Sequence, residues 1–282
     1  MTTEDINCVI CTNKLSALFE AQVMFSYNIS YYKCPVCGTI QTEKPYWLSE
    51  AYENAITATD IGLLSRNIDL STKVFNLITK TFDSSKKFLD FGGGYGVLVR
   101  LLRDKGLDFY RQDIYCQNIF AVNHDISDLK ENERRFELVS CFEVFEHVAD
   151  PFKLFEELLS YSSNILVSTV IIPENQSITS AADWWYFAPE TGQHITFYTM
   201  RSLALIAEKY GMNLYSDGQG LHLFTSKKLN DDPLKQRTSL VDKIRNKLIH
   251  ILSPSAKSGV ISLTQNDVAI AKARALQHIM NK

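Results

Sequence analysis

The sequence predicts an α/β fold built around a mostly parallel sheet, and two observations carry this prediction. A short apolar run, Phe88–Phe91, leads into a glycine-rich turn and then into a segment with the apolar spacing of a helix. Further short apolar runs alternate with helical patterns as far as Thr225, which is typical of β–α–β units. The 282-residue chain is 45% hydrophobic and 22% charged, values that exclude a wholly disordered protein.

The hydropathy of the chain indicates where the protein is located, and its charge indicates which partners it can bind. No apolar run approaches the roughly 18 residues that a membrane helix needs, and the N-terminus lacks the basic and apolar regions of a signal peptide. We therefore expect a cytoplasmic protein without a membrane span. The net charge of −3 is unevenly spread, because residues 227–282 carry eleven Lys and Arg against four Asp. This basic helical tail is either a solvated face or a site for an anionic partner.

Two pairs of cysteines near the N-terminus have the spacing of a zinc site. Each pair encloses two residues, and twenty-two residues separate the pairs. Four thiolates can surround a tetrahedral zinc ion and leave no coordination position open for catalysis. We predict a structural Zn²⁺ in an N-terminal zinc-binding module, residues 1–44, with the ligands Cys8, Cys11, Cys34 and Cys37.

Residues 45–80 are predicted to form a helical connector between this module and the glycine-rich turn. We expect the connector to pack over a ligand cleft, with Tyr46 or Tyr52 lining it. Its apolar stripe at helical spacing comprises Ile68, Val74, Leu77 and Ile78.

The glycine-rich turn has the spacing D-x-G-x-G-x-G, formed by Asp90, Gly92, Gly94 and Gly96. The dinucleotide fingerprint G-x-G-x-x-G/A does not fit, because Val97 stands where it requires glycine or alanine. The spacing resembles motif I of the class I S-adenosylmethionine-dependent methyltransferases. The resemblance extends over residues 81–226, and it implies a Rossmann-like core of seven strands whose last strand is antiparallel. It also implies S-adenosylmethionine (SAM) as the cofactor.

The same resemblance assigns the cofactor contacts. Asp113, at the end of the second core strand, would accept hydrogen bonds from the ribose hydroxyls. A third strand is expected at 121–126, where Asp125 would accept from the adenine amine and Ile126 would pack on the ring. The cofactor-binding residues expected from the resemblance are Asp90, Gly92, Gly94, Gly96, Asp113, Asp125, Ile126 and Glu143.

The fourth strand runs into Glu143-Val-Phe-Glu-His-Val-Ala-Asp-Pro, which resembles motif IV of small-molecule methyltransferases, including the ubiquinone-pathway O-methyltransferases. Asp150 and Pro151 are sound residues for the start of the helix that follows. The role of His147 stays open: it is a candidate catalytic base, or a ligand with Glu143 and Glu146 of a second metal ion. Glu143 and Glu146 are alternatively cofactor contacts.

An irregular stretch, residues 173–198, follows the fifth strand and is expected to form a lid over the cofactor. Ligands of open α/β sheets lie outside the carboxyl ends of the strands, which is where this lid belongs. Aromatic rings are unusual in a surface loop, and they stack well on the apolar faces of sugars. We expect some of these rings to pack on the body. The candidate substrate contacts are Trp184, Trp185, Tyr186, Glu190 and Gln193.

A hydroxyl acceptor needs a general base for methyl transfer, and imidazole has a suitable pKa near neutral pH. His194 lies in the segment Gly-Gln-His-Ile-Thr-Phe-Tyr, just before the helix that Thr199 is expected to cap. We predict His194 as the catalytic base, with His147 as the second catalytic candidate. A purely structural hydrogen bond is the alternative role for His194.

A zinc module before such a core resembles methyltransferases of deoxysugars and of bacterial surface glycans. This resemblance implies a small-molecule or glycan acceptor, and we expect O-methylation of a sugar hydroxyl in polysaccharide or nucleotide-sugar biosynthesis. Zinc-ribbon RNA methyltransferases and non-catalytic SAM-binding assembly subunits are the alternatives. A nucleic-acid substrate is disfavoured because residues 1–40 contain only two basic residues, Lys14 and Lys33.

Two amphipathic segments of the tail, 240–252 and 267–280, are candidate homodimer surfaces.

Overall fold

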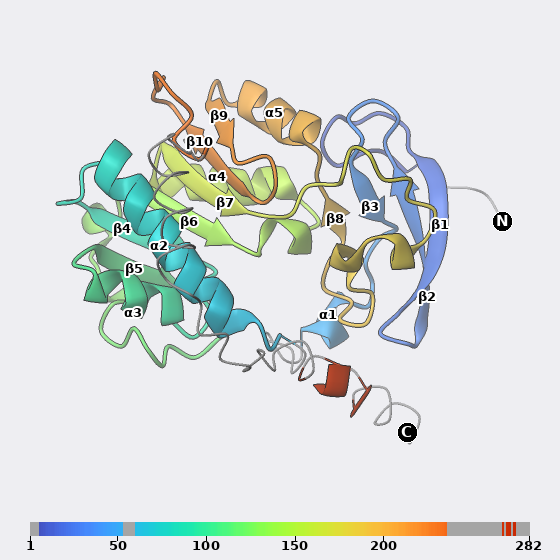
Figure 1. Ribbon diagram of the computed structural model, residues 1–282, viewed down its shortest axis with the longest axis horizontal. Coiled ribbons are helices and arrows are strands. Elements are labelled where there is room, and N and C mark those ends of the chain that lie inside the picture. The colour runs from blue at the N-terminus through green and yellow to red at the C-terminus, as the bar shows by residue number, and fades with distance from the viewer. Residues whose placement is uncertain (1–5, 53–59, 236–266, 268, 272, 275–282) are drawn as a thin grey trace, which may run out of the picture.

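A computed structural model describes residues 6–52, 60–235, 267, 269–271 and 273–274 of the chain. Within these residues the protein has a six-stranded sheet and a smaller four-stranded sheet beside it (Figure 1). The strands are β1 (Ser16–Val23), β2 (Tyr27–Lys33), β3 (Ile40–Thr42), β4 (Lys87–Phe91), β5 (Asp108–Gln112), β6 (Leu138–Phe142), β7 (Asn164–Ser168), β8 (Thr196–Phe197), β9 (Asn213–Ser216) and β10 (Leu221–Thr225). The helices are α1 (Leu48–Ala51), α2 (Leu63–Thr81), α3 (Val97–Asp104), α4 (Pro151–Tyr161) and α5 (Met200–Lys209), with short 3-10 turns η1 (Ile126–Asp128), η2 (Glu131–Glu133), η3 (Phe145–His147), η4 (Ala181–Asp183) and η5 (Trp185–Phe187).

The larger sheet has the strand order β5-β4-β6-β7-β10-β9. Strands β5, β4, β6 and β7 are parallel, whereas β10 is antiparallel to both of its neighbours, β7 and β9. The predicted class, a mostly parallel sheet with an antiparallel last strand, is therefore confirmed.

The expectation of seven strands is wrong by one, because residues 121–126 form no strand. Their pairing with β5 is reduced to a single bridge between Arg111 and Asp125. Asn123 has φ +65, a left-handed conformation that an extended strand cannot contain.

Each face of the larger sheet is covered by a pair of helices. Helices α2 and α3 pack on one face with Phe88, Leu138 and Leu223. Helices α4 and α5 pack on the other face together with the cysteine region of the N-terminal module. Buried α2 residues include Val74, Leu77 and Ile78 of the predicted stripe, whereas Ile68 is 59% exposed. Helix α4 begins as predicted, with the Asp150 side chain accepting a hydrogen bond from the Lys153 N–H.

The smaller sheet combines two distant parts of the chain. Its order is β1-β2-β3-β8, so the N-terminal hairpin is extended by a strand that lies at the end of the predicted lid. Ile40 pairs with Phe197 and Gln41 with Thr196. This pairing places the lid directly against the N-terminal module.

No helix in the described part of the chain is long and apolar enough to cross a membrane. The predicted amphipathic segments of the basic tail, and the dimer surface expected there, lie outside the described residues apart from short pieces between 267 and 274.

Candidate active site

A cavity of about 950 Å³ lies at the carboxyl ends of β4, β5 and β6. Its size is in the range of sites that enclose a small molecule or cofactor. The glycine turn after β4 forms one part of its wall, helix α2 another, and the lid region a third. Parallel strands of an open α/β sheet place ligands at this edge.

The glycine turn approaches the cavity closely. Gly92 and Gly94 line it, both with positive φ, whereas Gly96 lies just outside as the residue before α3. A Cβ at Gly92 would stand 2.6 Å from Cγ2 of Val144, on the loop after β6. The turn and the Val144 side chain therefore fit against each other only because residue 92 has no Cβ.

Substitution of Gly96 by alanine is expected to destabilise the protein more than the same change at Gly106. Both glycines have nearly equal φ, +87 and +89, but an added Cβ meets Ala121 at 2.8 Å in the first and nothing within 4 Å in the second. Gly106→Ala should cost about 1 kcal/mol of unfolding free energy for the left-handed backbone. Gly96→Ala should cost about 1–3 kcal/mol more, from the contact. Urea denaturation measures both, and equal losses would contradict the packing argument.

Asp90 lies near the end of β4 and is almost completely buried. It lines the cavity, and its Oδ1 accepts a hydrogen bond of 2.7 Å from the Ser140 hydroxyl. Burial raises the pKa of Asp90 to about 7, although the bond from Ser140 opposes the rise. Near pH 7 this carboxyl can therefore take up a proton, or pair with a cation, at little cost in free energy.

Asp113 organises the loop after β5. Its carboxylate accepts from the backbone N–H groups of Gly94 at 2.9 Å, Tyr115 at 2.8 Å and Cys116 at 2.7 Å. It also lines the cavity, where the sequence placed it. The strand end and the glycine turn are thus joined through one side chain.

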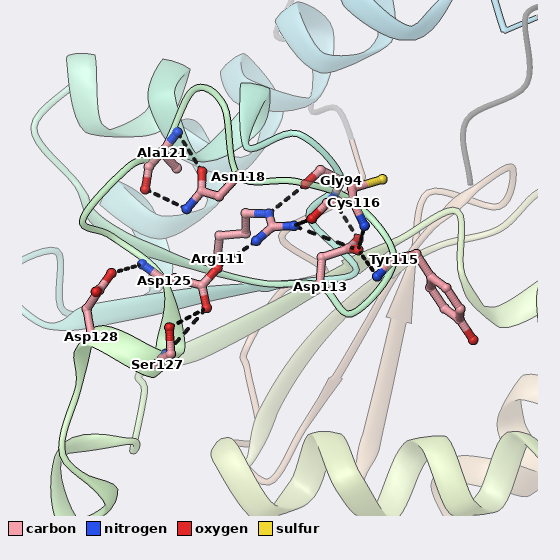
Figure 2. A network of polar contacts seen from close by, with 10 residues as sticks. All are labelled: Gly94, Arg111, Asp113, Tyr115, Cys116, Asn118, Ala121, Asp125, Ser127 and Asp128. Atoms are coloured by element: carbon pink, nitrogen blue, oxygen red, sulfur yellow. Dashed lines mark hydrogen bonds and ion pairs between the residues drawn. The ribbon is translucent and has the colours of Figure 1, made fainter. Parts of the chain in front are cut away.

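Arg111 contacts the segment where the third strand was expected. Its buried guanidinium donates to the carbonyl oxygens of Gly94 and Cys116 and to the carboxylate of Asp125, the last at 2.6 Å (Figure 2). The chain between β5 and Asp125 wraps around this guanidinium rather than pairing as a strand. Asp125 is consequently engaged in an ion pair, and neither it nor Ile126 lines the cavity, unlike our expectation.

Glu143, directly after β6, lines the cavity. It accepts a hydrogen bond of 2.6 Å from the Ser168 hydroxyl, and its φ of +54 is in the left-handed region. Burial raises the pKa of Glu143 to about 7, and repulsion from the nearby Glu146 adds to the rise. A half-buried carboxyl with a left-handed backbone at a cavity wall is typical of a functional position.

The two candidate histidines meet at the cavity. Both line it, and their ring centroids are 4.8 Å apart at a nearly perpendicular angle. The Nδ1 of His194 lies 2.6 Å from the carbonyl oxygen of Tyr186, so Nδ1 carries the proton and Nε2 holds a free lone pair. Burial lowers the pKa of both rings below the ordinary 6.5. His194 is therefore a neutral imidazole near pH 7.

Glu146 lies beside the His147 ring. It is fully buried, and its Oε1 accepts a hydrogen bond of 2.6 Å from the Tyr186 hydroxyl and lies 3.8 Å from Nε2 of His147. Burial raises the pKa of Glu146 to about 7, and the bond from Tyr186 opposes the rise.

Some aromatic residues of the lid are buried in the core, and others line the cavity. Trp184 is buried against Phe187 and Phe197 and does not line the cavity, unlike our expectation for a substrate contact. Packing among these rings and the N-terminal sheet accounts for its position. Lid residues that do line the cavity are Trp185, Tyr186, Glu190, Gln193 and His194. Trp185 is 75% exposed, and its ring meets that of Tyr186 at a nearly perpendicular angle, with the ring centroids 5.3 Å apart.

The connector fixes the lid from the other side. The Trp47 indole N–H donates to the Gly192 carbonyl at 2.8 Å, and the Gln193 amide donates to the Ala51 carbonyl at 2.9 Å. These bonds precede His194 directly and restrict its backbone. Tyr52, which follows Ala51 and lines the cavity as expected, stacks on Tyr115 with ring centroids 5.4 Å apart.

Sequence reasoning missed Arg66 and Asp60. Both line the cavity, and the Arg66 guanidinium pairs with Asp60 at 2.7 Å. Arg66 lies on the polar side of an amphipathic helix, where a charged residue ordinarily meets solvent. No pattern in the sequence distinguishes it from its neighbours.

The four N-terminal cysteines fit a tetrahedral zinc site. Their thiols are free, and Sγ separations are 3.5 Å for Cys8 and Cys37 and 3.3 Å for Cys11 and Cys34. All four sulfurs lie within 4.8 Å of one another. Four thiolates at tetrahedral zinc stand about 3.8 Å apart, since each Zn–S bond is about 2.3 Å. The cluster therefore needs only a small adjustment to hold the ion.

Comparison with known proteins assigns the family. Residues 65–217, more than half of the chain, match the family model described as a methyltransferase domain. A search of curated proteins finds no match.

Several solved structures resemble the chain at low identity. They include CalO1, a methyltransferase of calicheamicin biosynthesis in its SAH-bound form (10% identity, TM-score 0.39, 57% of this chain and 55% of that one). They also include the N-terminal domain of EvdMO1 in the presence of SAH and D-fucose (14%, 0.38, 57% and 83%). A third is the plantazolicin methyltransferase BpumL with a desmethyl analogue and SAH (15%, 0.38, 64% and 89%). The match spans about half the length of CalO1, and similarity at this level carries no information on the substrate.

Proposed function

Because this chain belongs to the methyltransferase family, as a SAM-dependent enzyme, we propose that it methylates a hydroxyl of a small molecule or glycan. The proposed acceptor class is a sugar hydroxyl of polysaccharide or nucleotide-sugar biosynthesis. One observation carries this proposal: the same cavity is lined by the glycine turn, by the His194 imidazole and by the exposed ring of Trp185. The four free cysteines favour the reducing cytoplasm as the compartment.

The glycine-turn end of the cavity is the proposed cofactor site. Asp90, Gly92, Gly94 and Asp113 line it, and the buried Asp90 suits a cationic amino group. SAM, when bound, supplies an electrophilic methyl group on its sulfonium. Gly96 supports this end from outside by its close contact with Ala121. Asp125 and Ile126 have no proposed part in it, because neither lines the cavity.

The lid end is the proposed acceptor site. Trp185 offers an apolar ring face to a sugar, and Glu190 places a carboxylate on the same cavity wall. Tyr186 and Gln193 shape this wall, with the Tyr186 hydroxyl bonded to Glu146 and the Gln193 amide bonded to the Ala51 carbonyl. His194 Nε2 would accept the proton of the acceptor hydroxyl as the hydroxyl oxygen takes the methyl group, whose bond to the sulfonium sulfur breaks so that S-adenosylhomocysteine leaves. The Tyr186 carbonyl stabilises the resulting imidazolium through Nδ1–H. His147, whose pKa is well below 6.5, is the less suitable base because its Nε2 already faces Glu146.

The test is a methyl-transfer assay with isotopically labelled SAM and fractionated lysate from cells that lack the protein. We expect label in the glycan or nucleotide-sugar fraction after addition of purified protein. Label in RNA would replace the acceptor assignment by the RNA-methyltransferase alternative. Label in no fraction, with SAM still bound, would favour a non-catalytic assembly subunit.

A further inference from the structure

Two buried polar atoms beside the acceptor site have no hydrogen-bond partner among the described residues. They are Oε2 of Glu146 and Nδ1 of His147. Such orphaned atoms are rare in folded proteins, because an unsatisfied buried polar group is costly. Glu146 is fully buried, so water does not reach its carboxylate from the surface. An ion bound by the Glu146 carboxylate would satisfy Oε2, and His147 lies close enough to share it, because its Nε2 is 3.8 Å from Oε1 of Glu146.

His194 supplies a third donor at the same place. Its Nδ1 is used by the Tyr186 carbonyl, which leaves the Nε2 lone pair available. One ligand atom each from Glu146, His147 and His194 lies within 4.8 Å of the other two. Glu143, which the sequence suggested as a ligand, is instead held by the Ser168 hydroxyl and is not part of this group.

The donor set selects the kind of ion. Two imidazoles with one carboxylate suit divalent transition metals such as Co²⁺, Ni²⁺ or Zn²⁺, whereas Mg²⁺ and Ca²⁺ prefer oxygen ligands alone. The cysteine cluster is a separate site with four sulfur ligands of its own.

We propose that Glu146, His147 and His194 form a binding site for a divalent transition-metal ion, and that an ion bound there blocks methyl transfer. The ion and the acceptor proton need the same lone pair, on Nε2 of His194. Metal binding and base catalysis therefore exclude each other. The binding rests only on the geometry, whereas the inhibition rests also on the proposed function of His194.

Binding is tested by adding Co²⁺ to protein whose cysteine site is already loaded with zinc, and by following the visible absorption of the bound cobalt. We expect one Co²⁺ per chain, and an affinity at least about tenfold lower in Glu146→Gln and in His147→Gln. The amide introduced by Glu146→Gln would keep an oxygen for the Tyr186 hydroxyl while removing the anionic ligand. His124→Asn is the matched control, since His124 lies outside the cavity, and it should bind as the wild type does. Absence of cobalt binding, or equal binding in all variants, would overturn the site.

Inhibition is tested with the labelled-SAM assay at rising Co²⁺. We expect activity to fall with the midpoint of the binding titration, to return on chelation, and to fall at a correspondingly higher concentration in Glu146→Gln. Cobalt binding that leaves the rate unchanged would overturn the exclusion. Failure to find any acceptor would defeat the proposed function, but the cobalt titration would still decide the site.

Discussion

His194→Asn is expected to lower kcat of methyl transfer by about 10²–10⁴-fold, the usual contribution of a general base. An asparagine amide can replace Nδ1–H as the donor to the Tyr186 carbonyl, so the lid should keep its conformation. It has no lone pair that accepts a proton near neutral pH. Since His194 lies at the acceptor end of the cavity, the Kd for SAM, measured by calorimetry, should stay close to that of the wild type.

The matched control is His124→Asn. His124 also uses Nδ1 toward a backbone carbonyl, that of Val122 at 3.0 Å, but it lies outside the cavity. Its kcat should equal that of the wild type. A His194→Asn protein that loses SAM binding together with kcat would contradict the base assignment and favour the structural role.

The pH dependence of kcat tests the role of His194 independently. Burial lowers the pKa of His194 below its ordinary 6.5, so the neutral base predominates at pH 7. As the pH falls through the lowered pKa, the imidazole gains a proton and the rate should decline. The acidic limb of kcat against pH should therefore have its midpoint below 6.5, and this limb should be absent from the residual activity of His194→Asn.

Cys37→Ser is expected to destabilise the protein by more than about 4 kcal/mol, because loss of a structural zinc site removes most of the folding energy of a small module. The effect should reach the lid. The Thr199 hydroxyl donates to the Cys37 carbonyl at 2.6 Å, and β3 pairs with β8, which begins two residues beyond His194. The zinc content measured by elemental analysis, the temperature of thermal unfolding and kcat should all decrease.

Val36→Ala is the control for that change. Val36 lies between the two cysteines of the second pair and is 42% exposed, so its truncation removes neither a ligand nor a buried contact. Zinc content and unfolding temperature should remain those of the wild type. A Cys37→Ser protein with full zinc and unchanged unfolding would refute the metal assignment.

The sequence alone determined the elements whose signals are local. The turn Asp90-Phe-Gly-Gly-Gly-Tyr-Gly forms between β4 and α3 as predicted, since few other residues tolerate its backbone. Asp150 and Pro151 start α4, and residues 221–225 form the antiparallel strand, because caps and apolar runs act over a few residues. The cysteine pairs likewise predicted their own cluster.

The tertiary structure decided which distant residues meet. No sequence pattern near Thr196 or Gln41 predicts that these residues pair in one sheet. Where the third strand was expected, the buried Arg111 guanidinium forms an ion pair with Asp125, a contact that strand propensity does not reveal. The contact of His147 with His194, and the packing of Trp184 away from the cavity, also depend on how the lid meets the N-terminal sheet. Local propensity carries no information on such long-range packing, and here that packing positions the proposed catalytic base.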